Sequence, residues 1–138
     1  MRHSVTMPTI LIDPPLLLSV RAGGFAGSFR ESPDLRFALS DHLPGWAYPD
    51  GWVSRVREAA LEECISFESV DASDMADLQS RLRHELADNE IASIAIARRQ
   101  GYRLSSDCPV LLRHGRQALG SGSVVPGQAI RVAIGCKV

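Results

Sequence analysis

The stretch DNEIASIAIARRQGYRLSSD, residues 88–107, decides which fold this chain is expected to adopt. Residues 91–97 are apolar or small at nearly every position, so a helix here must be covered on all sides. Gly101 ends that helix, and residues 102–105 then have the composition of a strand. Acidic residues stand on both sides of this buried segment, and their role is the question that the rest of the sequence has to answer.

Apolar runs separated by polar turns extend through the rest of the chain. The predicted strands are residues 9–12, 45–48, 65–70, 102–105 and 129–135. The predicted helices are residues 15–22, 34–43, 52–63, 74–86, 90–100 and 109–119. Ser73 is the expected N-cap of the fourth helix, Asp88 that of the fifth, and residues 120–128 are expected to form a loop. Strands that alternate with helices predict an α/β fold with a mainly parallel central sheet.

The composition and the length of the chain limit the classes of protein to which it can belong. With 138 residues, 45% hydrophobic and 22% charged, the chain is expected to form one soluble domain over residues 1–138. The formal net charge of −1 gives no global basic excess of the kind that indicates nucleic-acid binding.

Two further features bear on location. Cys64, Cys108 and Cys136 have no C-x-x-C spacing, so neither a zinc site nor a disulfide framework is indicated. The apolar stretch at residues 10–20 is interrupted by Asp13 and two prolines, which a secretory signal tolerates poorly. We therefore expect a cytoplasmic protein with no membrane partner.

Three acidic residues occupy positions of one kind. Asp13 follows the first predicted strand, Asp107 follows the strand at residues 102–105, and Glu90 opens the buried helix. In open parallel sheets, ligands bind outside the carboxyl ends of the strands, so these side chains are expected at the functional edge. Several carboxylates gathered there repel one another unless a cation neutralises them. Each acid taken singly is also well explained as a helix cap.

Residues 86–107 (LADNEIASIAIARRQGYRLSSD) resemble the late core of a PIN domain. In that family an acid opens an apolar, alanine-rich helix, a glycine ends it, and the next strand finishes in Ser/Thr-Asp. Residues 9–13 (TILID) are similar to the family's opening strand with its first catalytic aspartate. The matching segments lie between residues 9 and about 119, so the resemblance covers most of the chain.

The resemblance implies a three-layer α/β/α sandwich and metal-dependent endonucleolytic cleavage, usually of RNA. Asp13, Glu90 and Asp107 match the acidic positions that hold Mg²⁺ or Mn²⁺ in the family. Many members are toxins of toxin–antitoxin pairs, and many are dimers. RNA, an antitoxin protein and a second copy of the chain are therefore the partners that the resemblance implies.

The sequence also departs from the family pattern. Pro15 stands where the family usually has Ser or Thr, and Arg55 stands where it usually has an acid. Glu58, one helical turn beyond Arg55, is the fourth candidate ligand. An arginine beside the acids would displace a metal ion by forming a salt bridge, which leads to a second hypothesis: a degenerate PIN-like module that binds RNA or a protein partner without cleavage. A third is an unrelated α/β domain whose acids only cap helices and lie far apart.

Overall fold

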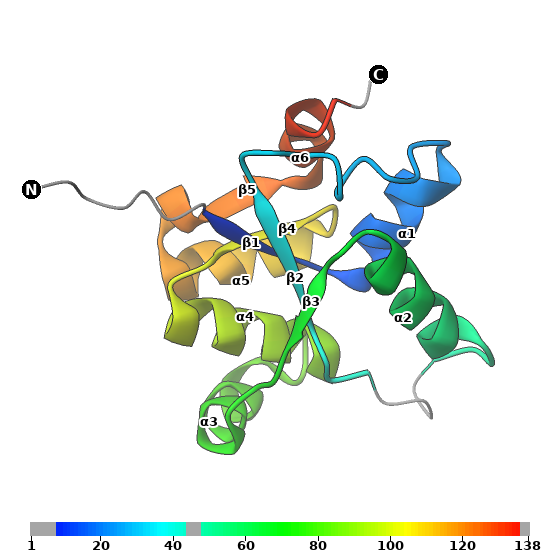
Figure 1. The fold of residues 1–138 in the computed structure, drawn as a ribbon. Coiled ribbons are helices and arrows are strands. Elements are labelled where there is room, and N and C mark those ends of the chain that lie inside the picture. The colour runs from blue at the N-terminus through cyan, green and yellow to red at the C-terminus, as the bar shows by residue number, and fades with distance from the viewer. Residues whose placement is uncertain (1–7, 44–47, 136–138) are drawn as a thin grey trace, which may run out of the picture.

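The computed structural model describes residues 8–43 and 48–135 (Figure 1). The chain order of its elements is β1 (Thr9–Ile12), α1 (Pro14–Ala22), β2 (Arg36–Ser40), α2 (Trp52–Glu62), β3 (Ser66–Glu68), α3 (Ala72–Leu82), α4 (Asp88–Gln100), β4 (Arg103–Ser106), α5 (Pro109–Leu119), the 3-10 turn η2 (Ser121–Ser123), β5 (Val124–Pro126) and α6 (Gly127–Ala133). No helix in this described part of the chain is both long enough and apolar enough to cross a membrane.

The five strands form one parallel sheet in the order β3-β2-β1-β4-β5. In the central strand β1, Leu11 pairs with Ala38 of β2 on one side and with Leu104 of β4 on the other. The predicted α/β class with a parallel central sheet is thereby confirmed.

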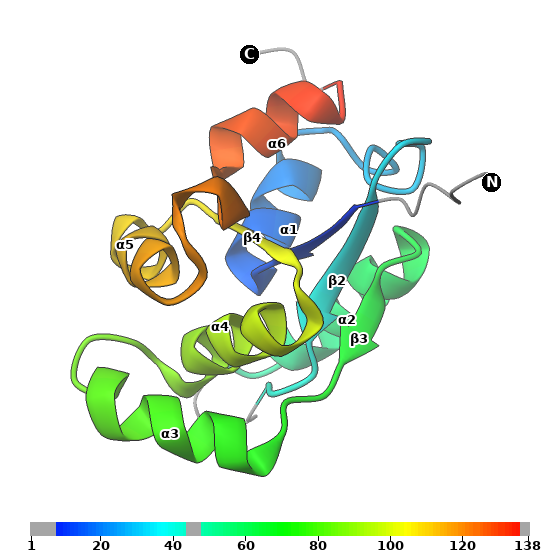
Figure 2. The same ribbon diagram turned by 90° about the vertical axis from the view of Figure 1, so that its left-hand side faces the viewer.

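The helices cover both faces of the sheet, which gives the three layers that the resemblance to PIN domains implies (Figures 1 and 2). Ile10 and Ile12 pack with α1 and α2 in one core, whereas Leu11, between them, packs with α4 in the other. This division follows from the pleat of a strand, which sends successive side chains to opposite faces. Helix α4 is covered on nearly all sides, because every residue from Ile91 to Ala97 is buried.

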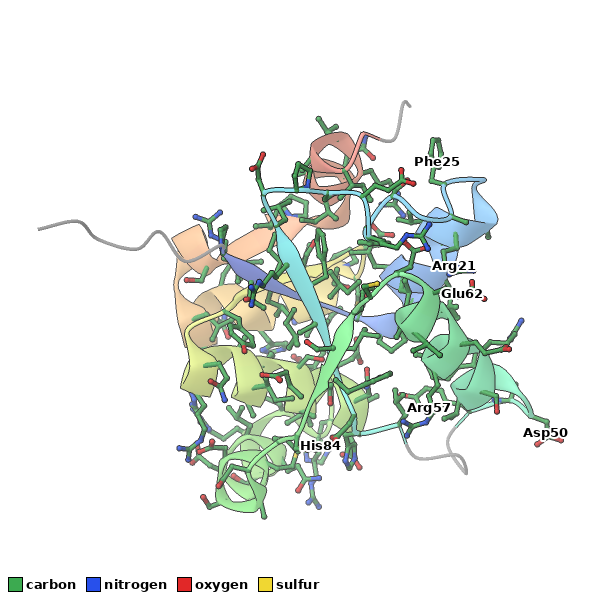
Figure 3. The ribbon with its side chains drawn as sticks, in the orientation of Figure 1. Arg21, Phe25, Asp50, Arg57, Glu62 and His84 are labelled. Carbon is green, nitrogen blue, oxygen red and sulfur yellow. The ribbon has the colours of Figure 1, made fainter. Side chains whose placement is uncertain are left out.

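Helices α1 and α2 lie side by side and are tied together at their final turns. Arg21 of α1 forms ion pairs with Glu62 and with the buried Glu63 at the end of α2 (Figure 3). At their other ends, both helices contribute a residue, Pro15 of α1 and Trp52 of α2, to the site described below.

Two predicted elements are wrong in type. Residues 34–43 were expected to be helical, but they contain the strand β2, in which Phe37, Ala38, Leu39 and Ser40 are all buried. Residues 129–135 were expected to be a strand, but α6 spans Gly127–Ala133 and buries Ile130. The predicted loop at residues 120–128 contains η2 and β5, which pairs with β4.

Smaller corrections concern helix starts. Asp71, not Ser73, is the N-cap of α3, and its side chain accepts hydrogen bonds from the backbone N–H groups of Ser73 and Asp74. Ala87 is the N-cap of α4, so Asp88 is the first residue inside that helix. The strand predicted at residues 45–48 falls, except for Tyr48, outside the described residues.

Candidate functional site

The candidate site lies where the strand order of the sheet reverses. From β1 the chain adds β2 and β3 on one side with helices over one face, and it then adds β4 and β5 on the other side with helices over the opposite face. The carboxyl ends of β1 and β4 flank this switch point, where open α/β sheets bind their ligands. Asp13 and Asp107 are the first residues after these two strands.

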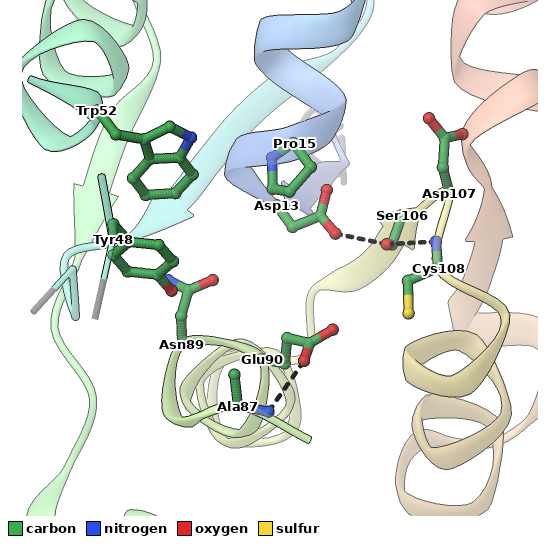
Figure 4. Close-up of a pocket in the computed structure, with 10 residues that line it drawn as sticks. All are labelled: Asp13, Pro15, Tyr48, Trp52, Ala87, Asn89, Glu90, Ser106, Asp107 and Cys108. Carbon is green, nitrogen blue, oxygen red and sulfur yellow. Dashed lines mark hydrogen bonds between the residues drawn. The ribbon is translucent and has the colours of Figure 1, made fainter. Parts of the chain in front are cut away.

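A pocket of about 450 Å³ opens at this point (Figure 4). Its lining residues are Asp13, Pro15, Tyr48, Trp52, Ala87, Asn89, Glu90, Ser106, Asp107 and Cys108. The three predicted acids, from three segments that are remote in sequence, therefore line one and the same pocket.

Asp13 is the most buried of the three acids, with only 4% of its surface exposed. Its Oδ1 accepts a hydrogen bond from the backbone N–H of Leu16 at 3.0 Å, so it caps α1, and its Oδ2 accepts one from the Ser106 hydroxyl. Burial raises the pKa of the Asp13 carboxyl to about 6, these two hydrogen bonds oppose the rise, and the negative charges of Glu90 and Asp107 add to it. Asp13 is therefore a buried carboxyl with a pKa of about 6, and two further carboxylates disfavour its ionisation.

Glu90 lies in the first turn of α4, half-buried. Its Oε1 accepts a hydrogen bond from the backbone N–H of Ala87 at 2.9 Å and so satisfies the start of the helix. Since alanine has no side-chain acceptor, Glu90 is the residue that caps this end. The predicted capping role is thus real, and it coexists with a place in the pocket.

Asp107 is held by an arginine from α6. Arg131 donates from Nη1 to Oδ1 and from Nη2 to Oδ2, both at 2.7 Å, and its Nη2 also reaches the Ser19 hydroxyl at 3.1 Å. These hydrogen bonds from Arg131 lower the pKa of Asp107 below its usual value. A Cβ atom at Gly127, the first residue of α6, would stand 2.0 Å from Asp107 Oδ1, so only glycine allows this carboxylate its position.

A divalent cation fits the chemistry of these donors, because Mg²⁺ and Mn²⁺ prefer carboxylate oxygens. The positions of the possible ligand side chains set a condition on metal binding. Within residues 8–43 and 48–135, no three His, Cys, Asp or Glu side chains are grouped so that they could hold a metal ion. Asp13 and Glu90 thus provide carboxylate oxygens in the pocket, whereas both oxygens of Asp107 accept hydrogen bonds from Arg131.

The other predicted positions are less central. Glu58 and Arg55 are exposed on α2, and neither is among the residues that line the pocket. The arginine beside the acids is Arg131 instead. Pro15 does line the pocket, without a hydroxyl group, and the hydroxyl that bonds to Asp13 comes from Ser106.

Sequence reasoning missed the non-acidic part of the site. The Tyr48 and Trp52 rings stack with their centroids 4.0 Å apart and their planes 18° apart. Asn89, 3% exposed, donates from Nδ2 to the backbone carbonyl of His42 at 3.0 Å. The aromatic residues around the turn were the available signal, but their spacing in sequence does not indicate a shared wall.

The chain has the PIN-like fold, that of PilT N-terminus domains. A PilT N-terminus domain protein from the hyperthermophilic archaeon Sulfolobus solfataricus P2 is similar over 94% of this chain and 96% of its own, with a TM-score of 0.55 and 10% identity. A protein from Pyrobaculum aerophilum is similar over 94% and 98%, with a TM-score of 0.54 and 13% identity. At such identities the likeness establishes the fold. No protein-family model and no curated protein matches the sequence.

Proposed function

We propose that this protein is a PIN-like, Mg²⁺- or Mn²⁺-dependent endoribonuclease with Asp13, Glu90 and Asp107 as the metal ligands. The observation that carries the proposal is the convergence of these three carboxylates on one pocket at the switch point of the sheet. If the acids served only as helix caps, they would have no reason to meet, because each cap needs only its own helix.

The chain's own residues supply several parts of this chemistry. The Ser106 hydroxyl fixes the orientation of the Asp13 carboxyl, and Ser106 Oγ itself accepts a hydrogen bond from the backbone N–H of Cys108 at 2.9 Å. Burial and the negative charges of Glu90 and Asp107 raise the pKa of Asp13 to about 6, and a divalent ion held there would stabilise the ionised carboxylate that these effects disfavour. A bound divalent ion would supply the acidified water and the charge stabilisation that phosphodiester cleavage needs.

The resemblance to PIN domains also suggests a substrate and a protein partner. Many PIN proteins are toxins that an antitoxin protein restrains, so we propose RNA as the substrate and an antitoxin as the protein partner.

A second candidate function rests on a different observation. Arg131 already neutralises Asp107 with two hydrogen bonds, as a metal ion would, and the pattern of the family is also altered at Pro15 and Arg55. These features favour a PIN-like module that binds RNA or a protein partner without cleavage. In that protein the pocket keeps its shape but binds no metal ion.

One experiment separates the two functions. Purified protein is incubated with a mixed single-stranded RNA substrate, with and without Mn²⁺, beside Asp107→Asn and the matched control Asp34→Asn, an exposed aspartate outside the pocket. The nuclease predicts Mn²⁺-dependent cleavage that Asp107→Asn lowers and Asp34→Asn leaves unchanged. Folded wild-type protein that neither cleaves nor binds Mn²⁺ in calorimetry would reject the nuclease and favour the non-cleaving module instead.

A further inference from the structure

One wall of the pocket is aromatic and faces the acids. The stacked rings of Tyr48 and Trp52 form this wall, and Figure 4 shows them across the pocket from Ser106 and Asp107. Trp52 is the first residue of α2 and packs against the core shared with α1, so its ring is held in place. Because each ring covers one face of the other, the wall offers outer ring faces and ring edges, a largely apolar surface in the same pocket as the carboxylates.

A directed polar group lies beside this wall. The Asn89 amide is anchored by its bond to the carbonyl of His42, and no donor among the described residues reaches its Oδ1, although Asn89 is almost entirely buried. An acceptor fixed in this way next to aromatic rings matches what a nucleobase needs, since RNA-binding sites stack an unpaired base on aromatic rings and bond its edge with an amide or backbone group. Burial, together with the charges of Glu90 and Asp88, raises the pKa of Tyr48, so its ring stays neutral.

We infer that the Tyr48–Trp52 wall is a nucleobase subsite, in which one unpaired base of single-stranded RNA stacks on an outer face of the ring pair and donates from its edge to Asn89 Oδ1. A volume of about 450 Å³ is sufficient for a nucleotide. The choice of RNA rests on the proposed nuclease function, but stacking itself needs no metal ion. Bases within a duplex are excluded, because their faces are already covered by neighbouring bases.

The subsite fixes the orientation of a bound nucleotide in the pocket. A base held against the Tyr48–Trp52 wall sends its ribose and phosphate across the pocket toward Asp13 and Glu90. The aromatic wall would then select single strands, and the acids would act on the phosphodiester bond next to the stacked nucleotide. Replacing the base-edge acceptor, Asn89, should change which base is preferred, whereas replacing a ring should weaken all bases alike.

The test measures base binding in the absence of metal. The chain has two tryptophans, so Trp46→Phe leaves Trp52 as the only indole reporter. Its fluorescence is titrated in EDTA with a six-nucleotide oligoadenylate and with a chain of the same length whose riboses carry no bases. Saturable quenching by the first ligand alone is expected; equal quenching by both, or by neither, would overturn the inference.

Variants of the two ring residues test whether the base binds at the Tyr48–Trp52 wall. Trp52→Leu and, as a second variant, Tyr48→Leu should each weaken oligoadenylate binding, measured by anisotropy of a labelled strand, by roughly 5- to 150-fold. Trp52→Phe should restore most of the affinity. Phe25→Leu is the matched control, because Phe25 lies in the segment after α1, away from the pocket (Figure 3). Unchanged affinity in folded Trp52→Leu and Tyr48→Leu proteins would refute the subsite.

The result is independent of catalysis. Base-dependent binding in EDTA without any Mn²⁺-dependent cleavage would support the subsite and reject the nuclease. Cleavage that the ring variants leave unaltered, with no base-dependent binding, would reject the subsite and leave the nuclease standing.

Discussion

Replacing Asp13 by asparagine should make the protein more stable at neutral pH, and the gain should vanish in acid. In the folded protein, burial raises the pKa of Asp13 from 3.8 to about 6, so keeping this carboxyl ionised costs free energy. That difference corresponds to about 3 kcal/mol, since one pKa unit is about 1.4 kcal/mol. Asparagine is neutral and close to isosteric, and its carbonyl can still accept from the Leu16 N–H.

The direction of the pH dependence follows from which state binds the proton more tightly. The folded pKa of Asp13 lies above the unfolded one, so the folded state holds more protons between about pH 4 and pH 6. The free energy of unfolding contributed by this group therefore falls as the pH rises through that window, and the full cost is present above about pH 6. Asp13→Asn removes the cost, so its advantage should grow from near zero at about pH 4 to as much as about 3 kcal/mol at about pH 8.

Urea unfolding followed by far-ultraviolet circular dichroism, in EDTA and across this pH range, measures the difference directly. Asp34→Asn, at an exposed position, is the control and should show no pH-dependent difference from wild type. A pH-independent difference between Asp13→Asn and wild type, or a difference that is larger in acid, would refute the account of Asp13 as a buried carboxyl with a raised pKa.

The remaining predictions concern the other side of the pocket. Gly127→Ala should destabilise the protein by up to about 1 kcal/mol, because the new Cβ would push the exposed Asp107 carboxylate off Arg131. In an Asp107→Ala background that cost should nearly disappear in urea unfolding, and a cost that persists would place the crowding elsewhere. Arg131→Gln should raise Mn²⁺ affinity in calorimetry by about tenfold, since it frees Asp107 from its bidentate partner. Arg131→Lys keeps the positive charge but loses the bidentate guanidinium, so its Mn²⁺ affinity should lie between those of wild type and Arg131→Gln. A Mn²⁺ affinity of Arg131→Gln below that of wild type would instead show that Arg131 supports metal binding.

The parts of the fold that the sequence predicts correctly are those with strong local signals. The middle of α4, from Ile91 to Ala97, is apolar or small at every position, and the helix ends at Gly101, which adopts a positive φ of 71°, so local composition suffices there. At β2 the signals conflict, because leucines at positions 35, 39 and 43 recur with helical spacing. Pairing with β1 and β3 decides that segment, and such pairing with residues distant in sequence leaves no local trace.

The residues of the site also divide into those with a local sequence signal and those placed by tertiary contacts. Asp13, Glu90 and Asp107 could be predicted to share a pocket, because each follows from where a parallel strand ends or a buried helix begins. The role of Arg131 could not be predicted, because its segment has an alternating pattern that favours a strand. Only the helix α6 brings the Arg131 guanidinium to Asp107. The aromatic wall depends on how α2 packs against α1, which is again a matter of tertiary contact.

The central position of β1 has a consequence for folding kinetics. Leu11 pairs at once with Ala38 and with Leu104, so the second pairing closes a very long loop of chain. Contacts of such long sequence separation form late and slowly, because their loop-closure entropy must be overcome first. Until β1 and β4 meet, Asp13 and Ser106 stay apart and no pocket exists. A chain interrupted during refolding should thus have much of its helix content but none of its binding capacity.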